Sequence, residues 1–219
     1  MKRSALKCYW AFVPLAYKVG MILSALVICG VGILFYYGLG LGSVIILGPL
    51  FLLLVGLVDY VAFSGVFSKK IKAMDFMKSS VYGPELVKKT LITDMIVKTL
   101  IFFIGCAGIG IVAVIDGTFW LVMAEVFLLY MAAAFYTLIF TRKYGTSIQM
   151  QILILYLGIH LASGLMALYM FITVGAPEIG MSAALYRILS MVVILAFAVS
   201  GGYLLCKDGT AGFKNGYKD

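Results

Sequence analysis

Six Asp, Glu, Lys, Arg or His side chains lie within long apolar runs of this sequence, where a charge is costly and is therefore a candidate for function. Asp94 and Lys98 are four residues apart, so a helix would place them on one face as a local ion pair. Asp59, in the preceding run, can instead bridge to Lys98. A structural bridge is the simplest interpretation of this group. The other three of these side chains are Glu125, His160 and Arg187.

Glu125 and Arg187 have opposite charges and fall at comparable depth in the fourth and sixth apolar runs. Two such residues can pair across a helix bundle. The alternative is that Arg187 extends its side chain outward to the membrane surface while Glu125 meets polar neighbours.

His160 is the only histidine, which excludes zinc sites that need several imidazoles. Ser163 and Gly164 follow it, but Leu161 stands where the nucleophile motif of an intramembrane serine protease requires glycine. Ser163 is also only three residues from His160, whereas the nucleophile and base of such enzymes come from different spans. We expect His160 to be neutral and hydrogen-bonded within the bundle, with a polar substrate path as the alternative.

The sequence contains no Gly-Lys pair, and therefore no glycine-rich loop of the kind that cradles nucleotide phosphates. If ATP drives this protein, another chain binds it. We therefore expect no enzymatic activity and no cofactor or metal in this chain.

The composition predicts that a bilayer surrounds most of the chain. The 219 residues are 64% hydrophobic and 12% charged, whereas a soluble domain is about 25% charged. A spanning helix needs roughly 20 apolar residues. Six runs approach or exceed this length, which predicts a single all-α domain over residues 1–219 with about six transmembrane helices: 19–38, 44–67, 91–115, 119–140, 148–174 and 185–206.

The basic residues predict the orientation. If six spans alternate in direction, the Lys and Arg residues between and beside the runs all fall on one side of the membrane. The three turns on the other side contain no Lys or Arg. Because cytoplasmic loops are enriched in Lys and Arg, we expect a multi-pass protein of the cell membrane with both termini in the cytoplasm. The net charge of +8 thus marks topology and does not indicate nucleic-acid binding.

Two segments outside the runs have helical apolar spacing. Residues 1–18 predict a helix in the membrane interface that turns at Pro14 into the first span, with a disordered basic tail as the alternative. Residues 68–90 predict a cytoplasmic loop that divides at Gly83-Pro84, and residues 207–219 a cytoplasmic tail. Before that division an apolar stripe predicts an amphipathic helix that covers lipid or a partner protein: Ile71, Met74, Met77 and Val81, flanked by Phe76 and Tyr82.

This layout resembles the permease subunits of ABC-2-type exporters, and its small size is similar to the peptide-exporting members. The resemblance is architectural and covers nearly the whole chain. It implies a permease that dimerises and forms a path for an amphipathic or hydrophobic substrate, in this case a peptide. It also implies that residues Ile71 to Tyr82 dock a separate ABC ATPase. A polysaccharide exporter of this family is one alternative. A second is the membrane subunit of a vitamin-uptake system, which also has about six spans and a partner ATPase module. A third is an uncharacterised membrane protein.

Overall fold

The computed structural model describes residues 5–39, 42–67, 79–112, 117–145, 147–175 and 183–215. Within these ranges all regular structure is α-helical. The helices are α1 (Ala5–Phe12), α2 (Leu15–Leu39), α3 (Gly42–Phe67), α5 (Gly83–Val112), α6 (Gly117–Tyr144), α7 (Ile148–Gly175) and α8 (Ala183–Asn215).

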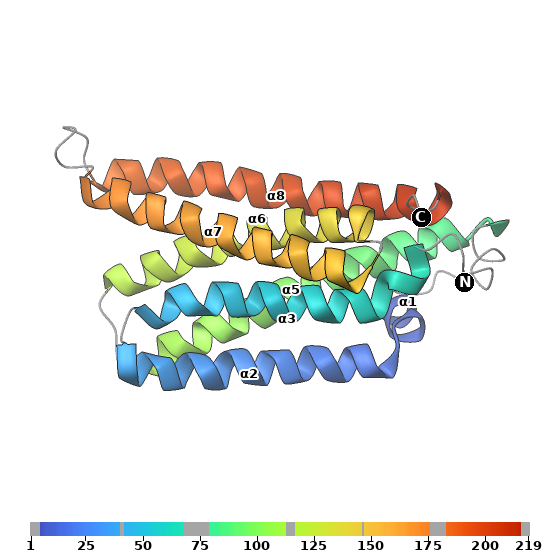
Figure 1. Ribbon diagram of the computed structural model, residues 1–219, viewed down its shortest axis with the longest axis horizontal. Helices are drawn as coiled ribbons and strands as arrows, with labels where there is room; N and C mark the ends of the chain where they lie inside the picture. Colours follow the sequence, from blue (N-terminus) through green and yellow to red (C-terminus); the bar gives the residue numbers. More distant parts are fainter. Residues whose placement is uncertain are drawn as a thin grey trace.

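The six long helices lie side by side in a bundle, and successive helices run in opposite directions (Figure 1). At one end, α2, α5 and α7 begin and α3, α6 and α8 finish, and the short α1 lies there too. We name this the basic end, because the described lysines outside the bundle interior all lie there: Lys7, Lys18, Lys88, Lys89, Lys143, Lys207 and Lys214.

Within the described ranges, five helices are long and apolar enough to cross a membrane: α2, α5, α6, α7 and α8. The helix α3 has 26 residues, and its described apolar stretch, Ile46–Tyr60, is shorter than a full span. The chain is therefore a polytopic all-α membrane protein, as its composition predicts.

Local chemistry explains where several helices begin. Pro14 separates α1 from α2, and its carbonyl accepts hydrogen bonds from the N–H groups of Tyr17 and Lys18. The first turn of α5 holds Pro84, which fits where helical N–H groups have no partner. Ser147 caps α7 by accepting a hydrogen bond from the Met150 N–H.

The segment before α5 and the end of the chain show where helical structure stops and starts. The amphipathic helix expected to reach Tyr82 does not include Val81 and Tyr82. These residues lie in a turn closed by hydrogen bonds from the Gly83 N–H to both oxygens of Ser80. Within the loop expected over residues 68–90, α5 begins at Gly83, at the division that the sequence predicted, and within the tail expected from Lys207, α8 continues as far as Asn215.

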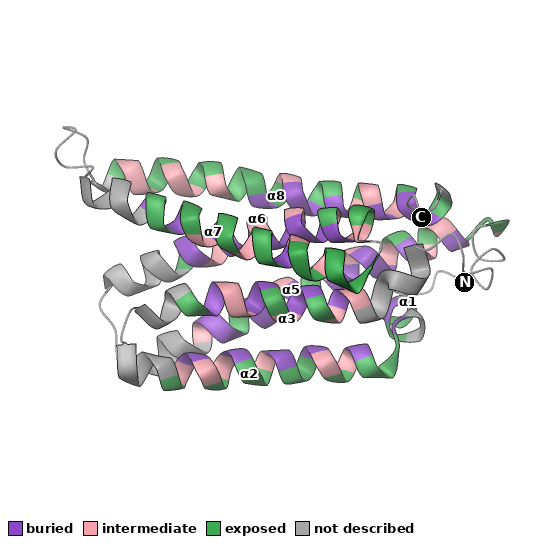
Figure 2. Cartoon of the chain, viewed as in Figure 1, coloured by how far each residue is buried: buried purple, intermediate pink, exposed green. Residues whose placement is uncertain are grey.

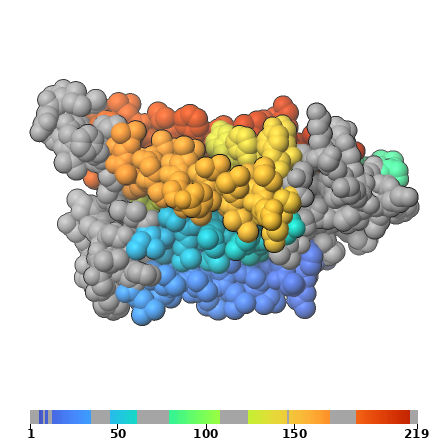
Figure 3. Space-filling model, in the orientation of Figure 1, coloured from blue at the N-terminus to red at the C-terminus, as the bar shows by residue number. Residues whose placement is uncertain are grey.

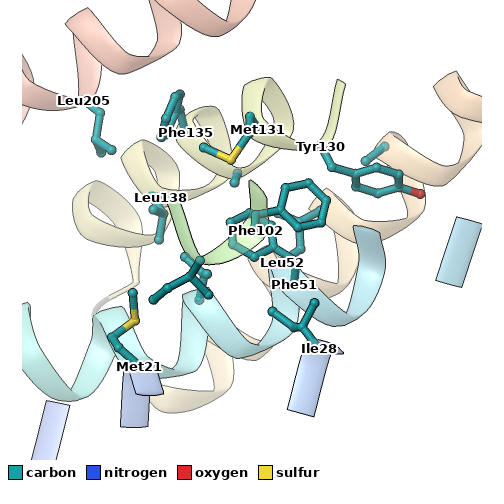
Figure 4. Packing of buried hydrophobic residues seen from close by; sticks show 14 of the residues in the cluster. Met21, Ile28, Phe51, Leu52, Phe102, Tyr130, Met131, Phe135, Leu138 and Leu205 are labelled. Carbon is teal, nitrogen blue, oxygen red and sulfur yellow. The ribbon is translucent and has the colours of Figure 1, made fainter. Parts of the chain in front are cut away.

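The bundle interior is formed mainly by α3, α5 and α6, whereas α2, α7 and α8 expose much of their surface (Figure 2). Phe51 of α3 and Phe102 of α5 stack with ring centroids 4.2 Å apart, and both are fully buried (Figure 4). Phe127 of α6 continues the stack, with its ring 5.5 Å from that of Phe102. This apolar core packs α3, α5 and α6 together at their middles. The same three helices also supply most of the buried charges.

Glycines allow neighbouring helices to approach closely. A Cβ atom at Gly48 of α3 would lie 2.2 Å from ring atoms of Tyr130 on α6, and one at Gly56 would lie 2.1 Å from Leu155 on α7. The same holds for Gly158 of α7 against Thr137 of α6, at 2.5 Å. In lipid the hydrophobic effect does not draw helices together. Close packing at small residues such as these glycines favours helix association instead.

Candidate functional site

Charged side chains from three long helices meet inside the bundle toward the basic end. The spacing of Asp94 and Lys98 places both on the inner face of α5, and Asp59 of α3 lies opposite them. Arg142, two residues from the end of α6, reaches the same place. We call these four residues, with Tyr17 of α2, the charge network.

Lys98 lies at the centre of the charge network. Its Nζ donates hydrogen bonds to Asp59 Oδ1 and to Asp94 Oδ2, each at 2.5 Å. Thus the local pair and the bridge between helices, the two arrangements expected from the sequence, are both present.

Arg142 binds the carboxylate of Asp59 with two nitrogens. Its Nε lies 2.9 Å from Asp59 Oδ2 and its Nη2 lies 2.6 Å from Asp59 Oδ1, while Asp94 Oδ2 is 3.7 Å from Nη2. The Tyr17 hydroxyl donates to Asp94 Oδ1. All four carboxylate oxygens of the charge network therefore accept at least one hydrogen bond.

The charge network is neutral and almost completely shielded from the surroundings. Two carboxylates balance one ammonium and one guanidinium, and these four side chains are between 1% and 4% exposed. Buried charges persist when they are paired and hydrogen-bonded, and removal of one partner leaves the other uncompensated. Each of its carboxylate oxygens already accepts a hydrogen bond. The charge network is therefore better suited to holding the helices together than to taking up a proton.

The charge network extends to α1 and is covered by α8. Tyr9 of α1 is buried and hydrogen-bonded to Tyr17; burial raises the pKa of the Tyr9 phenol, and the nearby Asp94 carboxylate raises it further. On the other side, a Cβ atom at Gly209 of α8 would lie 3.6 Å from Arg142 Nη1. Helices from both ends of the sequence thus converge on the same group of charges.

A second pair of charges lies in the opposite half of the bundle. Arg187 Nε of α8 is 3.8 Å from Glu125 Oε1 of α6, so the pairing expected from the sequence is present as a long contact. Glu125 is 1% exposed and Arg187 is 25% exposed. Among the described residues, neither carboxylate oxygen of Glu125 has a hydrogen-bond partner, so this pair is looser than the charge network.

His160 lies at the surface of the bundle, where the sequence had indicated an inward position. Its Nδ1 donates to the Tyr156 carbonyl oxygen of its own helix at 2.8 Å, and the two rings are 3.9 Å apart. The side chain is exposed on the outer face of α7, between Leu157 and Leu161. A polar path through the interior of this single bundle would not include it.

The residues expected to dock an ATPase are only partly described. Ile71, Met74, Phe76 and Met77 lie outside the described residues. Val81 and Tyr82 form an exposed apolar turn at the basic end, with 89% and 78% of their surfaces accessible. This turn leads directly into α5, the helix that carries Asp94 and Lys98.

Sequence reasoning missed two members of the charge network, Arg142 and Tyr17. Arg142 follows the apolar run 119–140 and adjoins Lys143, which is typical of a basic loop, yet its side chain is buried. A usable signal was charge balance, because Asp59 and Asp94 need a second cation to neutralise them. Tyr17 carries no charge, and no feature of the sequence distinguishes it from an aromatic residue of the interface.

The comparisons with known proteins add no family to these observations. Comparisons with protein-family models, curated proteins and solved structures found no match to this chain. Within the described ranges, no three His, Cys, Asp or Glu side chains are grouped so that they could hold a metal ion. The helical bundle and its two sites of buried charge are therefore the basis for a functional proposal.

Proposed function

We propose that this chain is the transmembrane permease subunit of an ATP-driven exporter and works with a separate ABC ATPase. The main support is the connection between the exposed Val81-Tyr82 turn and the charge network. The turn adjoins the first residue of α5, and Asp94 and Lys98 lie three to four helical turns farther along the same helix. A partner that displaces the turn would displace both charged residues with it.

The charge network would pass that displacement to neighbouring helices. Lys98 and Asp94 of α5 hold Asp59 of α3 and Tyr17 of α2, and Asp59 holds Arg142 of α6. These contacts favour movement of α2, α3, α5 and α6 as one unit at the basic end. Such coupling is what a permease needs if ATP is hydrolysed by another subunit.

In this proposal the chain has six spans, with α3 as the second, and the basic end faces the cytoplasm. The absence of Lys and Arg from the three opposite turns supports this orientation. Then α1 lies in the cytoplasmic interface and both termini are cytoplasmic. Two copies, or one copy and a related subunit, form the path for an amphipathic or hydrophobic peptide, as the family resemblance implies.

A cross-linking experiment with matched variants tests the role of the turn. A tagged chain is cross-linked in native membranes, and the ATPase recovered with it is quantified by mass spectrometry. Tyr82→Ser removes an exposed aromatic ring from the turn, and Tyr144→Ser removes a half-exposed ring from the end of α6 at the same end of the bundle.

We expect Tyr82→Ser to reduce ATPase recovery at least fivefold, because a few apolar anchors dominate most interfaces. Tyr144→Ser should leave recovery within twofold of the parent. Equal recovery with all three proteins would refute the docking role of the turn. Absence of any ABC ATPase from the parent sample would refute the permease proposal itself.

A further inference from the structure

The junction between α1 and α2 presents a lysine held against an exposed tryptophan. The Lys18 Nζ lies 4.4 Å from the centroid of the Trp10 ring, and it donates a hydrogen bond to the Trp10 carbonyl oxygen at 2.6 Å. Trp10 is 59% exposed. The ammonium is therefore fixed beside an open aromatic face, and the described contacts use one of its three N–H donors.

An apolar stripe leads away from this lysine along α2. Leu15, Val19, Ile22 and Leu26 follow one another at helical spacing, and all four are exposed. In the space-filling view, α2 forms one edge of the molecule (Figure 3). A polar group bound at Lys18 could therefore carry hydrocarbon chains that lie along this stripe toward the middle of the bundle.

The surrounding charge is positive. Outside the charge network, the described part of the basic end has seven lysines but only two carboxylates, Glu85 and Asp208. Glu85 is already paired with Lys89 at 2.6 Å. An anion is thus attracted to this end, and tryptophan at such a position favours the level of the lipid headgroups.

From these features we propose that Lys18 and Trp10 form a binding site for the headgroup of an anionic phospholipid, whose acyl chains cover the exposed stripe of α2. The Lys18 ammonium binds the phosphate, and the Trp10 ring packs against the glycerol region. The site is connected to the bundle interior, because Tyr9 on the buried side of α1 is hydrogen-bonded to Tyr17 of the charge network. This proposal requires only a membrane, and it does not depend on the permease function.

Quenching of Trp10 fluorescence by brominated lipids tests the site. The chain has two tryptophans, so Trp120→Phe gives a parent in which Trp10 is the only one. This parent is reconstituted in vesicles that contain either dibrominated phosphatidylglycerol in phosphatidylcholine or dibrominated phosphatidylcholine in phosphatidylglycerol. Lys18→Gln is the test variant. Lys214→Gln removes the same charge from an exposed position at the end of α8 and is the control.

In the parent we expect phosphatidylglycerol to bind beside Trp10 about fivefold more strongly than phosphatidylcholine, which corresponds to ~1 kcal/mol for one basic residue. Lys18→Gln should bring the ratio close to one, and Lys214→Gln should preserve it. If Lys18→Gln does not fold, the parent is measured in 1 M salt instead, and the salt should lower its preference for phosphatidylglycerol.

Three results would overturn the proposal. The first is equal quenching of the parent by the two brominated lipids, and the second is an unchanged ratio in Lys18→Gln. The third is the absence of quenching by either lipid in the parent, because Trp10 would then be covered by protein, either a second copy of the chain or another subunit.

Discussion

Replacement of Lys98 by methionine should destabilise the bundle strongly, because Lys98 donates hydrogen bonds to both aspartates of the charge network. Methionine has a similar length but no charge, so two carboxylates would share the single guanidinium of Arg142. Asp59 would keep its two bonds to that group, whereas Asp94 would keep the Tyr17 hydroxyl and a cation at 3.7 Å.

Removal of one partner from a buried ion pair typically costs about 3–5 kcal/mol, and we expect a loss in this range. The double variant Lys98→Met with Asp94→Asn should recover much of it. One charge of each sign is then removed, Asp59 and Arg142 remain as a neutral pair, and the asparagine oxygen can still accept from Tyr17. The remaining cost is about two net hydrogen bonds, or ~1–2 kcal/mol.

The free energy of unfolding can be measured by titration of mixed micelles with a denaturing detergent, with circular dichroism as the signal. The reactivity of Cys106, which is buried in the folded chain, gives an independent measure. A cost below about 1 kcal/mol for Lys98→Met would contradict this reasoning. A double variant as unstable as Lys98→Met alone would also contradict it, because the effect would then not arise from uncompensated charge.

Two further predictions concern helix packing and the second charge pair. Gly48→Ala should lower the unfolding free energy by about 1–3 kcal/mol in the same assay, because its Cβ would overlap the buried Tyr130 ring, whereas Gly164→Ala, with open space around it, should change it by less than about 0.5 kcal/mol. Equal effects of the two would refute the close contact. Arg187→Gln should cost about 2 kcal/mol more than Glu125→Gln, because it leaves a buried carboxylate, while a lone Arg187 can extend to the membrane surface. Equal costs of these single substitutions would show that the two side chains do not pair.

Hydropathy predicted much of this fold because a bilayer permits few alternatives. The six expected runs coincide with the six long helices, and the differences are concentrated at the helix ends. Helix ends depend on local hydrogen bonds, such as the turn between Ser80 and Gly83, and these are not visible in apolar patterns. The described apolar stretch of α3, Ile46–Tyr60, is shorter than a full span, so the assignment of α3 as a span stays a prediction.

The candidate site was only partly predictable, for a different reason. The four-residue spacing of Asp94 and Lys98 is fixed by helix geometry and can be read directly. Arg142 is two residues from the end of its helix, and only the packing of α6 against α3 turns its side chain toward Asp59. The outward position of His160 also depends on how α7 is rotated in the bundle, which the nearly uniform apolar sequence of that helix does not specify.

Export of a peptide by the reconstituted complex tests the central proposal most directly. The chain and the ATPase recovered with it are placed in proteoliposomes, and a fluorescent amphipathic peptide is added outside together with ATP. In the molecules whose basic end faces outward, ATP should drive the peptide into the vesicle lumen, and vesicles with the ATPase alone should show no such uptake. If ATP produces the same accumulation with and without this chain, or none in either case, the chain is not the permease that we propose.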